Sequence, residues 1–229
     1  MPRRRPHDRL DQILQAATRI FARTGLENSK MSEVATEAGV SQGTLYNYVE
    51  SKEALFRLLL DRGLGTPPPA STALPLRSPS AASLARRMDE AIAANFALPR
   101  LDKALTRRRV TDPTVELTEV IDELYERTLA TREAADVLER SARDVPELAA
   151  VFYGKARRGL FERLERLVSR RVMSGHYHDR DPRVVARIIA ETVTTFARHI
   201  HGDVDPPVFD LASARAVVIE VLVTGIVKH

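Results

Sequence analysis

The amino-acid sequence predicts an all-α protein with a small N-terminal helical domain and a larger C-terminal helical domain. Apolar residues recur at spacings of three and four in almost every long segment, which is the periodicity of an amphipathic helix. Only 10 of the 229 residues are glycine and 5% are aromatic, so strand signals are nearly absent. The length suits one large domain or a small domain joined to a larger one.

We expect residues 1–62 to form the N-terminal domain, which holds three predicted helices and most of a fourth. Gly25 follows an apolar helical face and is a natural stop. Ser41 and Ser51 are good N-caps for the third and fourth helices. The predicted helices are, in order, 8–24, 31–38, 44–48 and a fourth that starts after Ser51 and ends near Gly63 or Gly65.

Residues 63–80 contain five of the thirteen prolines, with alanine and serine among the rest. Because proline cannot donate a backbone hydrogen bond, this composition predicts a mobile linker or a long loop. It separates the N-terminal domain from residues 81–229, the predicted C-terminal domain.

The predicted helices of residues 81–229 have clear start signals. Asp112 and Asp181 each precede a proline, which places an N-cap acid before the first helical position, and Asp210 is a further N-cap. The expected helices are 81–98, 103–109, 115–143, 147–174, 183–201 and 211–227.

Composition and motifs exclude several classes of protein. The chain has no cysteine, which rules out disulfides, thiolate metal sites and iron–sulfur clusters. No nucleophile motif, phosphate-binding loop or glycine-rich nucleotide fingerprint is present, so we expect neither an enzyme nor a cofactor. No apolar run follows the basic N-terminus, and the most apolar stretch, 217–227, is short and contains Glu220. We therefore expect a cytoplasmic protein with no membrane segment.

The strongest functional signal is a helix-turn-helix pattern at residues 31–48. Two short helices flank a turn at residues 39–41, and the second helix carries more polar and aromatic groups than a core could bury. Glutamine and asparagine can pair with adenine edges, whereas hydroxyl groups can donate to phosphates. A solvated helix with two surface tyrosines is the alternative. The side chains in question are Gln42, Thr44, Tyr46, Asn47 and Tyr48.

The N-terminal part of the sequence resembles the DNA-binding domain of the TetR (tetracycline-repressor) family of bacterial regulators. The resemblance covers about residues 8–60 and is carried by VATEAGVSQGTLYNYVESKEAL at 34–55, Ala16-Ala17 and the segment 21–25. It implies an all-helical homodimer that represses transcription until a small molecule enters a C-terminal ligand-binding and dimerisation domain. The family often has a basic residue where this chain has Glu50. The implied contacts to double-stranded DNA are Lys30, Ser41, Gln42, Thr44, Tyr46, Asn47, Tyr48 and Lys52.

Three arginines precede the first predicted helix and form a candidate DNA-binding arm. Such an arm reaches phosphates or the minor groove beside a helix-turn-helix. A disordered solvated tail is the alternative interpretation. The residues are Arg3, Arg4 and Arg5.

The last two predicted helices carry little charge, and the final one is apolar over much of its circumference. Such a helix is either central in the monomer core or covered by another subunit. A buried strand at residues 217–223 is the other possibility, which the absence of a partner strand argues against. In the TetR family these two helices form a four-helix bundle across a two-fold axis, which implies a palindromic operator. The candidate dimer residues are Val185, Ile188, Ile189, Phe196, Val217, Val218, Val221 and Leu222.

The resemblance also implies an effector pocket between residues 81 and 174, whose small-molecule ligand is unknown. Ordinary core packing is the alternative role for each candidate. Paired histidines at 176/178 and 199/201 suggest a metal site, but side chains two residues apart on a helix point in different directions, so we expect no metal. The candidate pocket residues are Met88, Phe96, Tyr125, Phe152, Tyr153 and Phe161.

The sequence therefore predicts a ligand-responsive repressor that binds a palindromic operator as a homodimer and is released by a small molecule. The alternative is an adaptor of the same fold that acts mainly through protein partners. The polar face of the second helix of the motif favours the first prediction.

Overall fold

The computed structural model describes residues 6–63, 65–67, 70, 73–205 and 207–228. Most of the described residues are helical, with two isolated β-bridges and no extended sheet among them, which confirms the all-α prediction. They divide into two compact units. Unit 1 comprises residues 1–95 and 133–156, and unit 2 comprises residues 96–132 and 157–229. None of the described helices is long and apolar enough to span a membrane.

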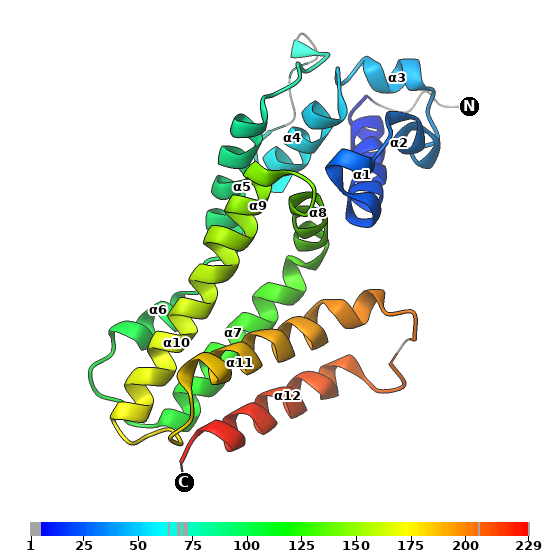
Figure 1. Cartoon of the computed structure of the whole chain (residues 1–229). Coiled ribbons are helices and arrows are strands. Elements are labelled where there is room, and N and C mark those ends of the chain that lie inside the picture. The colour runs from blue at the N-terminus through cyan, green and yellow to red at the C-terminus, as the bar shows by residue number, and fades with distance from the viewer. Residues whose placement is uncertain (1–5, 64, 68–69, 71–72, 206, 229) are drawn as a thin grey trace. The chain divides into compact units, whose positions relative to one another are not determined.

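Unit 1 combines the N-terminal helices with a helical segment from later in the chain (Figure 1). Its core contains the rings of Phe21 and Phe56, which meet edge to face with their centres 5.7 Å apart. The division into domains 1–62 and 81–229, separated by 63–80, remains a prediction. The helices of unit 1 are α1 (Pro6–Asn28), α2 (Met31–Glu37), α3 (Gln42–Tyr46), α4 (Lys52–Gly63), α5 (Ala81–Asn95), α8 (Arg132–Ala142), α9 (Pro146–Ala149) and the π-helix η2 (Ala150–Arg157). The first residue of α8, Arg132, and the last residue of η2, Arg157, belong to unit 2.

The predicted N-caps of unit 1 are confirmed. The Ser41 hydroxyl accepts a hydrogen bond from the Thr44 amide at 3.1 Å, at the start of α3. The Ser51 hydroxyl accepts one from the Ala54 amide at 3.2 Å, at the start of α4. Each bond satisfies an amide that has no partner within its own helix, which explains why these helices begin where they do.

Gly25 interrupts α1 with a backbone that only glycine adopts readily, at φ 77° and ψ 170°. The interruption lets the end of α1 pack on α8, where the Leu26 amide donates to the Ser141 hydroxyl at 3.2 Å. A Cβ atom on Gly25 would lie 3.0 Å from the carbonyl oxygen of Arg140.

We expect Gly25→Ala to lower the free energy of unfolding by about 1–3 kcal/mol, because alanine is strained at this φ and meets a backbone oxygen. Urea denaturation followed by circular dichroism measures the change. Gly154→Ala is the matched control, since a Cβ there meets nothing within 4 Å. Equal stabilities of the Gly25 and Gly154 variants would contradict this account.

The described part of the proline-rich segment, residues 73–80, is anchored to unit 1. The Leu76 amide donates to the Tyr48 carbonyl and the Glu50 amide donates to the Leu76 carbonyl, both at 2.9 Å. These bonds form a parallel bridge between Val49 and Leu76, and the Leu76 side chain packs against the core. This part of the segment is therefore a bound loop and not a free linker, because it contributes an apolar side chain that composition alone did not single out.

Unit 2 holds the remaining helices, whose three predicted aspartate caps are confirmed. The carboxylates of Asp112, Asp181 and Asp210 accept amide hydrogen bonds at 3.0, 2.9 and 2.8 Å. The hydrogen bonds from Ser213 hold the pKa of Asp210 below its usual value. The hydrogen bond from the Arg183 side chain likewise lowers the pKa of Asp181. The helices are α6 (Pro99–Thr106), α7 (Pro113–Ala130), α10 (Arg158–Met173), α11 (Pro182–Ala197), the 3₁₀ helix η3 (His199–Gly202) and α12 (Leu211–Ile226).

The single helix predicted over 115–143 is wrong. The structure ends α7 at Ala130 and begins α8 at Arg132. Thr131 lies between them with φ −106° and ψ 8°, and its hydroxyl donates to the Arg127 carbonyl at 2.7 Å. A threonine hydroxyl that bonds back in this way competes with helix continuation, whereas the apolar spacing runs on past it.

A buried ion pair joins α7 to α10 inside unit 2. Glu116 and Arg171 are 2% and 3% exposed, and the Arg171 Nε donates to the Glu116 carboxylate at 2.6 Å. The Arg171 Nη2 donates to the same carboxylate at 3.0 Å and to the Ala104 carbonyl at 2.9 Å. Burial raises the pKa of the neighbouring Tyr177 hydroxyl, and the Glu116 charge adds to this effect. The pair ties three helices together.

Candidate nucleic-acid interface

The α2–turn–α3 pair is held by its apolar side chains, which all face the core of unit 1. Val34 and Ala35 of α2 and Leu45 of α3 are at most 2% exposed. Gly39 makes the turn at φ 66°, and the Val40 amide donates back to the Ala35 carbonyl at 3.0 Å. Leu45 is the buried residue of the five-residue α3, whereas Gln42, Gly43 and Tyr46 are exposed, so the side of this helix away from Leu45 faces outward.

Three side chains of this outward face are free to bind a partner. Gln42 and Asn47 are exposed, and Tyr46 is 44% exposed. Within the part of the chain that the structure describes, none of the three side chains forms a hydrogen bond. Two amides and a phenol with unused donors and acceptors are the groups that read base edges and bind phosphates.

Other predicted DNA contacts have roles inside the protein. The Ser41 and Thr44 hydroxyls lie 2.9 Å apart at the cap of α3. The ring of Tyr48 packs partly against the core, and its carbonyl accepts the Leu76 amide. The Lys52 ammonium donates to the Glu27 carbonyl and lies 3.7 Å from the Glu27 carboxylate.

The remaining candidates lie before these elements. Lys30 is exposed at the N-cap position of α2, where its side chain makes no capping bond. Arg3, Arg4 and Arg5 lie outside the described residues, and their role in DNA binding remains a prediction.

The predicted effector-pocket residues fall into both units and have partners within their own unit. In unit 1, Met88 is fully buried, and the rings of Phe152 and Tyr153 meet edge to face at 5.1 Å. In unit 2, the Tyr125 hydroxyl donates to the Phe196 carbonyl at 3.1 Å, and Phe161 lies beneath the guanidinium of Arg187 at 4.7 Å. Phe96, half-buried, belongs to the same unit. The contact of these residues with an effector remains a prediction.

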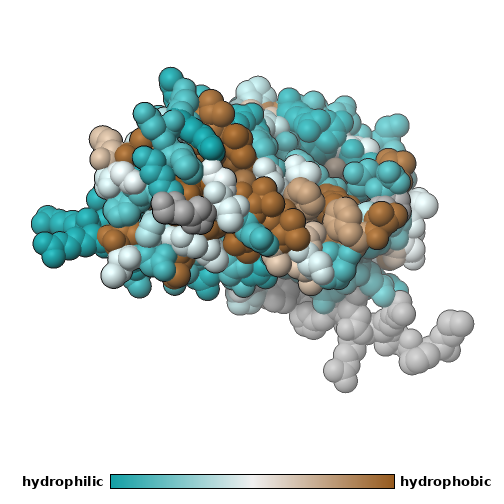
Figure 2. Space-filling model, turned by 90° about the horizontal axis from the view of Figure 1, so that it is seen from below, coloured by the Kyte–Doolittle hydropathy of each residue, from teal (hydrophilic) through white to brown (hydrophobic). Residues whose placement is uncertain are grey.

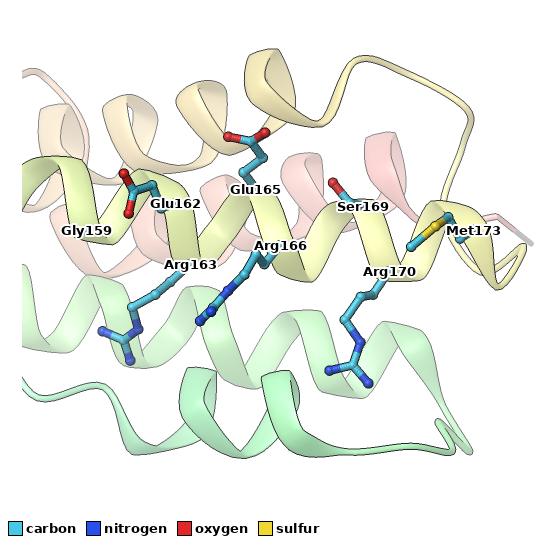
Figure 3. Close-up of a pocket in the computed structure, with 8 residues that line it drawn as sticks. All are labelled: Gly159, Glu162, Arg163, Glu165, Arg166, Ser169, Arg170 and Met173. Carbon is cyan, nitrogen blue, oxygen red and sulfur yellow. The ribbon is translucent and has the colours of Figure 1, made fainter.

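Two hollows on unit 2 are lined by other residues. One, of about 680 Å³, is an open trough along α10 (Figure 3). Figure 3 shows Arg163, Arg166 and Arg170 on one side of the helix and Glu162 and Glu165 on the other. Arg163 binds Asp102, and Arg170 binds the Leu105 carbonyl, so these two cations of the trough already hold α6. A smaller hollow, of about 300 Å³, is lined by Arg108, Val110, Arg170, Arg171, Met173, Ser174 and His176.

The predicted dimer residues divide between the core and the surface of unit 2. Val185, Ile189, Val218 and Leu222 are at most 6% exposed and pack inside the unit, where Phe196 is half-buried. Their packing places them in the monomer's own core. Ile188, Val217 and Val221 are 49–61% exposed, and so is Val184, which the sequence argument did not select. Figure 2 shows hydrophobic side chains gathered on the face seen from below.

The paired histidines at 176/178 and 199/201 lie within the described residues. Among the residues that the structure describes, no group of three or more histidine, aspartate or glutamate side chains is placed to hold a metal ion. The Nδ1 atom of His176 instead lies 2.7 Å from the Ser174 hydroxyl.

The packed α2–turn–α3 pair and its exposed polar face define a helix-turn-helix protein. Residues 13–59 match the sequence model of a family described as bacterial regulatory proteins, tetR family. The N-terminal segment is therefore that of the tetR family, which confirms the resemblance in the sequence.

Curated relatives match a segment of about 50 residues of this chain. The transcriptional regulator YfiR of Bacillus subtilis is 42% identical over 53 residues, which are 23% of this chain and 26% of that protein. The transcriptional repressor DrrR1 of Streptomyces coeruleorubidus is 43% identical over 53 residues, 23% of this chain and 20% of the repressor. The match thus spans about a quarter or less of these relatives.

A solved structure extends the similarity of fold to the whole chain. The ketosteroid transcriptional regulator KstR2 of Mycobacterium tuberculosis superposes with a TM-score of 0.62 at 16% identity, over 96% of both chains. The fold is therefore shared with a transcriptional regulator beyond the helix-turn-helix segment.

Proposed function

We propose that this protein is a ligand-responsive transcriptional repressor that binds a palindromic operator as a homodimer and is released from it by a small molecule. The observation that carries the proposal is the exposed set of Gln42 and Tyr46 on α3 and Asn47 directly after it, whose side chains form no hydrogen bond among the described residues. A glutamine and an asparagine amide can each pair with an adenine edge, and the tyrosine offers a hydroxyl and a ring face.

The helix-turn-helix supplies the geometry for this contact. The second helix of such a pair enters the major groove with its N-terminal residues, while the first crosses the backbone. Here Gln42 is the first residue of α3, and Leu45 anchors the opposite face in the core. The exposed side chains can therefore contact a duplex without local unfolding of the protein.

The exposed apolar residues of α11 and α12 support a two-fold dimer. Val184 and Ile188 are four residues apart on α11, as are Val217 and Val221 on α12, so each pair forms a stripe on one helix face. A second copy would cover these stripes and present two α3 helices to two half-sites, which is why the expected operator is a palindrome.

Release by an effector follows as a shift between two states of the protein. The effector must bind the DNA-incompetent state more tightly, because a ligand with equal affinity for both states shifts nothing.

Selection of bound duplexes from a random DNA pool tests the proposal. We expect the wild-type protein to enrich a palindrome, and the double variant Tyr46→Ala, Asn47→Ala to bind it at least tenfold more weakly, because each lost base contact costs about 1–3 kcal/mol. Non-specific binding should change little. Both side chains lack partners among the described residues, so thermal unfolding should match the wild type and serve as the folding control.

Enrichment of no sequence by the wild-type protein would contradict the proposal and favour the adaptor that acts through protein partners. Enrichment of the same palindrome by both proteins would show that α3 does not read the sequence through these residues.

A further inference from the structure

The helix-turn-helix of this chain is poor in positive charge. Residues 30–53 contain two lysines and four glutamates, and hence a net charge of −2. One of the two lysines, Lys52, is occupied by Glu27. Since neutralisation of phosphates by lysine and arginine supplies much of the affinity of DNA-binding proteins, cations from outside this segment are required beside α3.

The loop anchored at the end of α3 supplies such a cation. The backbone of Leu76 pairs with Tyr48 on one side and Glu50 on the other, so the loop runs beside the residues that leave α3. Paired backbones of this kind lie about 4.8 Å apart. Arg77 is the next residue, and its backbone is therefore held beside residues 48–50, which follow α3.

The side chain of Arg77 faces away from the core. Neighbouring residues of extended chain point to opposite sides, and Leu76 packs against the core, so Arg77 points to solvent. Arg77 is exposed, and no hydrogen bond or ion pair engages it within the described part of the chain. The Glu50 carboxylate nearby accepts the Ser78 amide at 3.3 Å, which directs one of its oxygens to the loop.

We propose that Arg77 binds a DNA backbone phosphate beside the groove that α3 enters, so that residues 76–78 form part of the DNA-binding surface. This inference rests on the proposed function. The contact carries no sequence information itself, because phosphates are common to all duplexes, and it fixes the register of α3 on the DNA.

The test measures DNA affinity as a function of salt for the wild type, Arg77→Gln and Arg77→Lys, on the selected palindrome and on an unrelated duplex. Each phosphate contact contributes about −0.9 to the slope of log K against log salt. We expect Arg77→Gln to reduce the steepness of that slope by about one per protomer and to weaken both duplexes by a similar factor, up to about tenfold. Arg77→Lys keeps the charge and should retain the wild-type slope.

Arg158→Gln is the matched control, because Arg158 is exposed on α10 of unit 2 and its substitution removes the same charge. It should leave the slope unchanged. A wild-type slope in Arg77→Gln, or an equal reduction in Arg158→Gln, would overturn the inference while leaving the proposed function intact. Absence of duplex binding by the wild-type protein would overturn both.

Discussion

Arg171→Met is expected to lower the free energy of unfolding by about 3–5 kcal/mol, because it leaves the Glu116 carboxylate buried without its partner. Glu116 is 2% exposed and receives two hydrogen bonds from Arg171, at 2.6 and 3.0 Å. Water cannot replace these bonds at so buried a position, and the third contact, from Arg107 at 3.4 Å, is long. Chemical denaturation of the wild type and of Arg171→Met measures the difference in the free energy of unfolding.

The double variant Glu116→Met, Arg171→Met separates the cost of the lone charge from the value of the pair. Replacing both partners by apolar side chains of similar size is often neutral, so the double variant should be more stable than Arg171→Met alone. Arg183→Met is the surface control. Its partner is Asp181, and the two side chains are 76% and 45% exposed, so the expected loss is below about 1 kcal/mol. A double variant less stable than the single one would contradict the account.

Val221→Asp is expected to convert the proposed homodimer into a monomer. Val221 is 61% exposed on α12, on the same face as Val217, and a second copy would bury it. An uncompensated carboxylate in an apolar interface costs several kcal/mol, and two-fold symmetry introduces it twice. The dissociation constant of the dimer should therefore rise by at least about a hundredfold.

Sedimentation equilibrium over a range of protein concentrations measures this effect. Val204→Asp is the matched control, because Val204 is 99% exposed and lies outside the helices. It should leave the association unchanged. A wild-type protein that is monomeric at high concentration, or a Val221→Asp variant that associates as strongly as the wild type, would contradict the proposed dimer.

Local signals in the sequence predicted the elements that depend on local interactions. Ser41, Asp112, Asp181 and Asp210 cap helices in the structure as predicted, because a cap bonds an amide two or three residues away. The helix-turn-helix was predictable for the same reason, because the glycine of the turn, the buried leucine of α3 and the polar groups around that leucine lie close together in the sequence. The exposed Gln42 and Asn47 followed from the lack of any further apolar anchor on that helix.

The choice of which face of α11 and α12 lies inside was a tertiary outcome. Helical spacing groups Ile188 with Ile189 and Val217 with Val218 as equally apolar neighbours. The structure buries Ile189 and Val218 and exposes the other two. The periodicity shows that α11 and α12 carry apolar residues on several faces. The packing of the neighbouring helices decides which of these faces is buried.

The sequence by itself determined the helical class, the helix-turn-helix and the capped starts of its helices, because these depend on residues within about one helical turn of each other. Only the tertiary structure paired Arg171 with Glu116, 55 residues apart, and bound Leu76 beside the end of α3. Such contacts join segments whose local patterns carry no record of each other. They arise when packing brings a buried charge or an unpaired backbone group within reach of a partner from another segment.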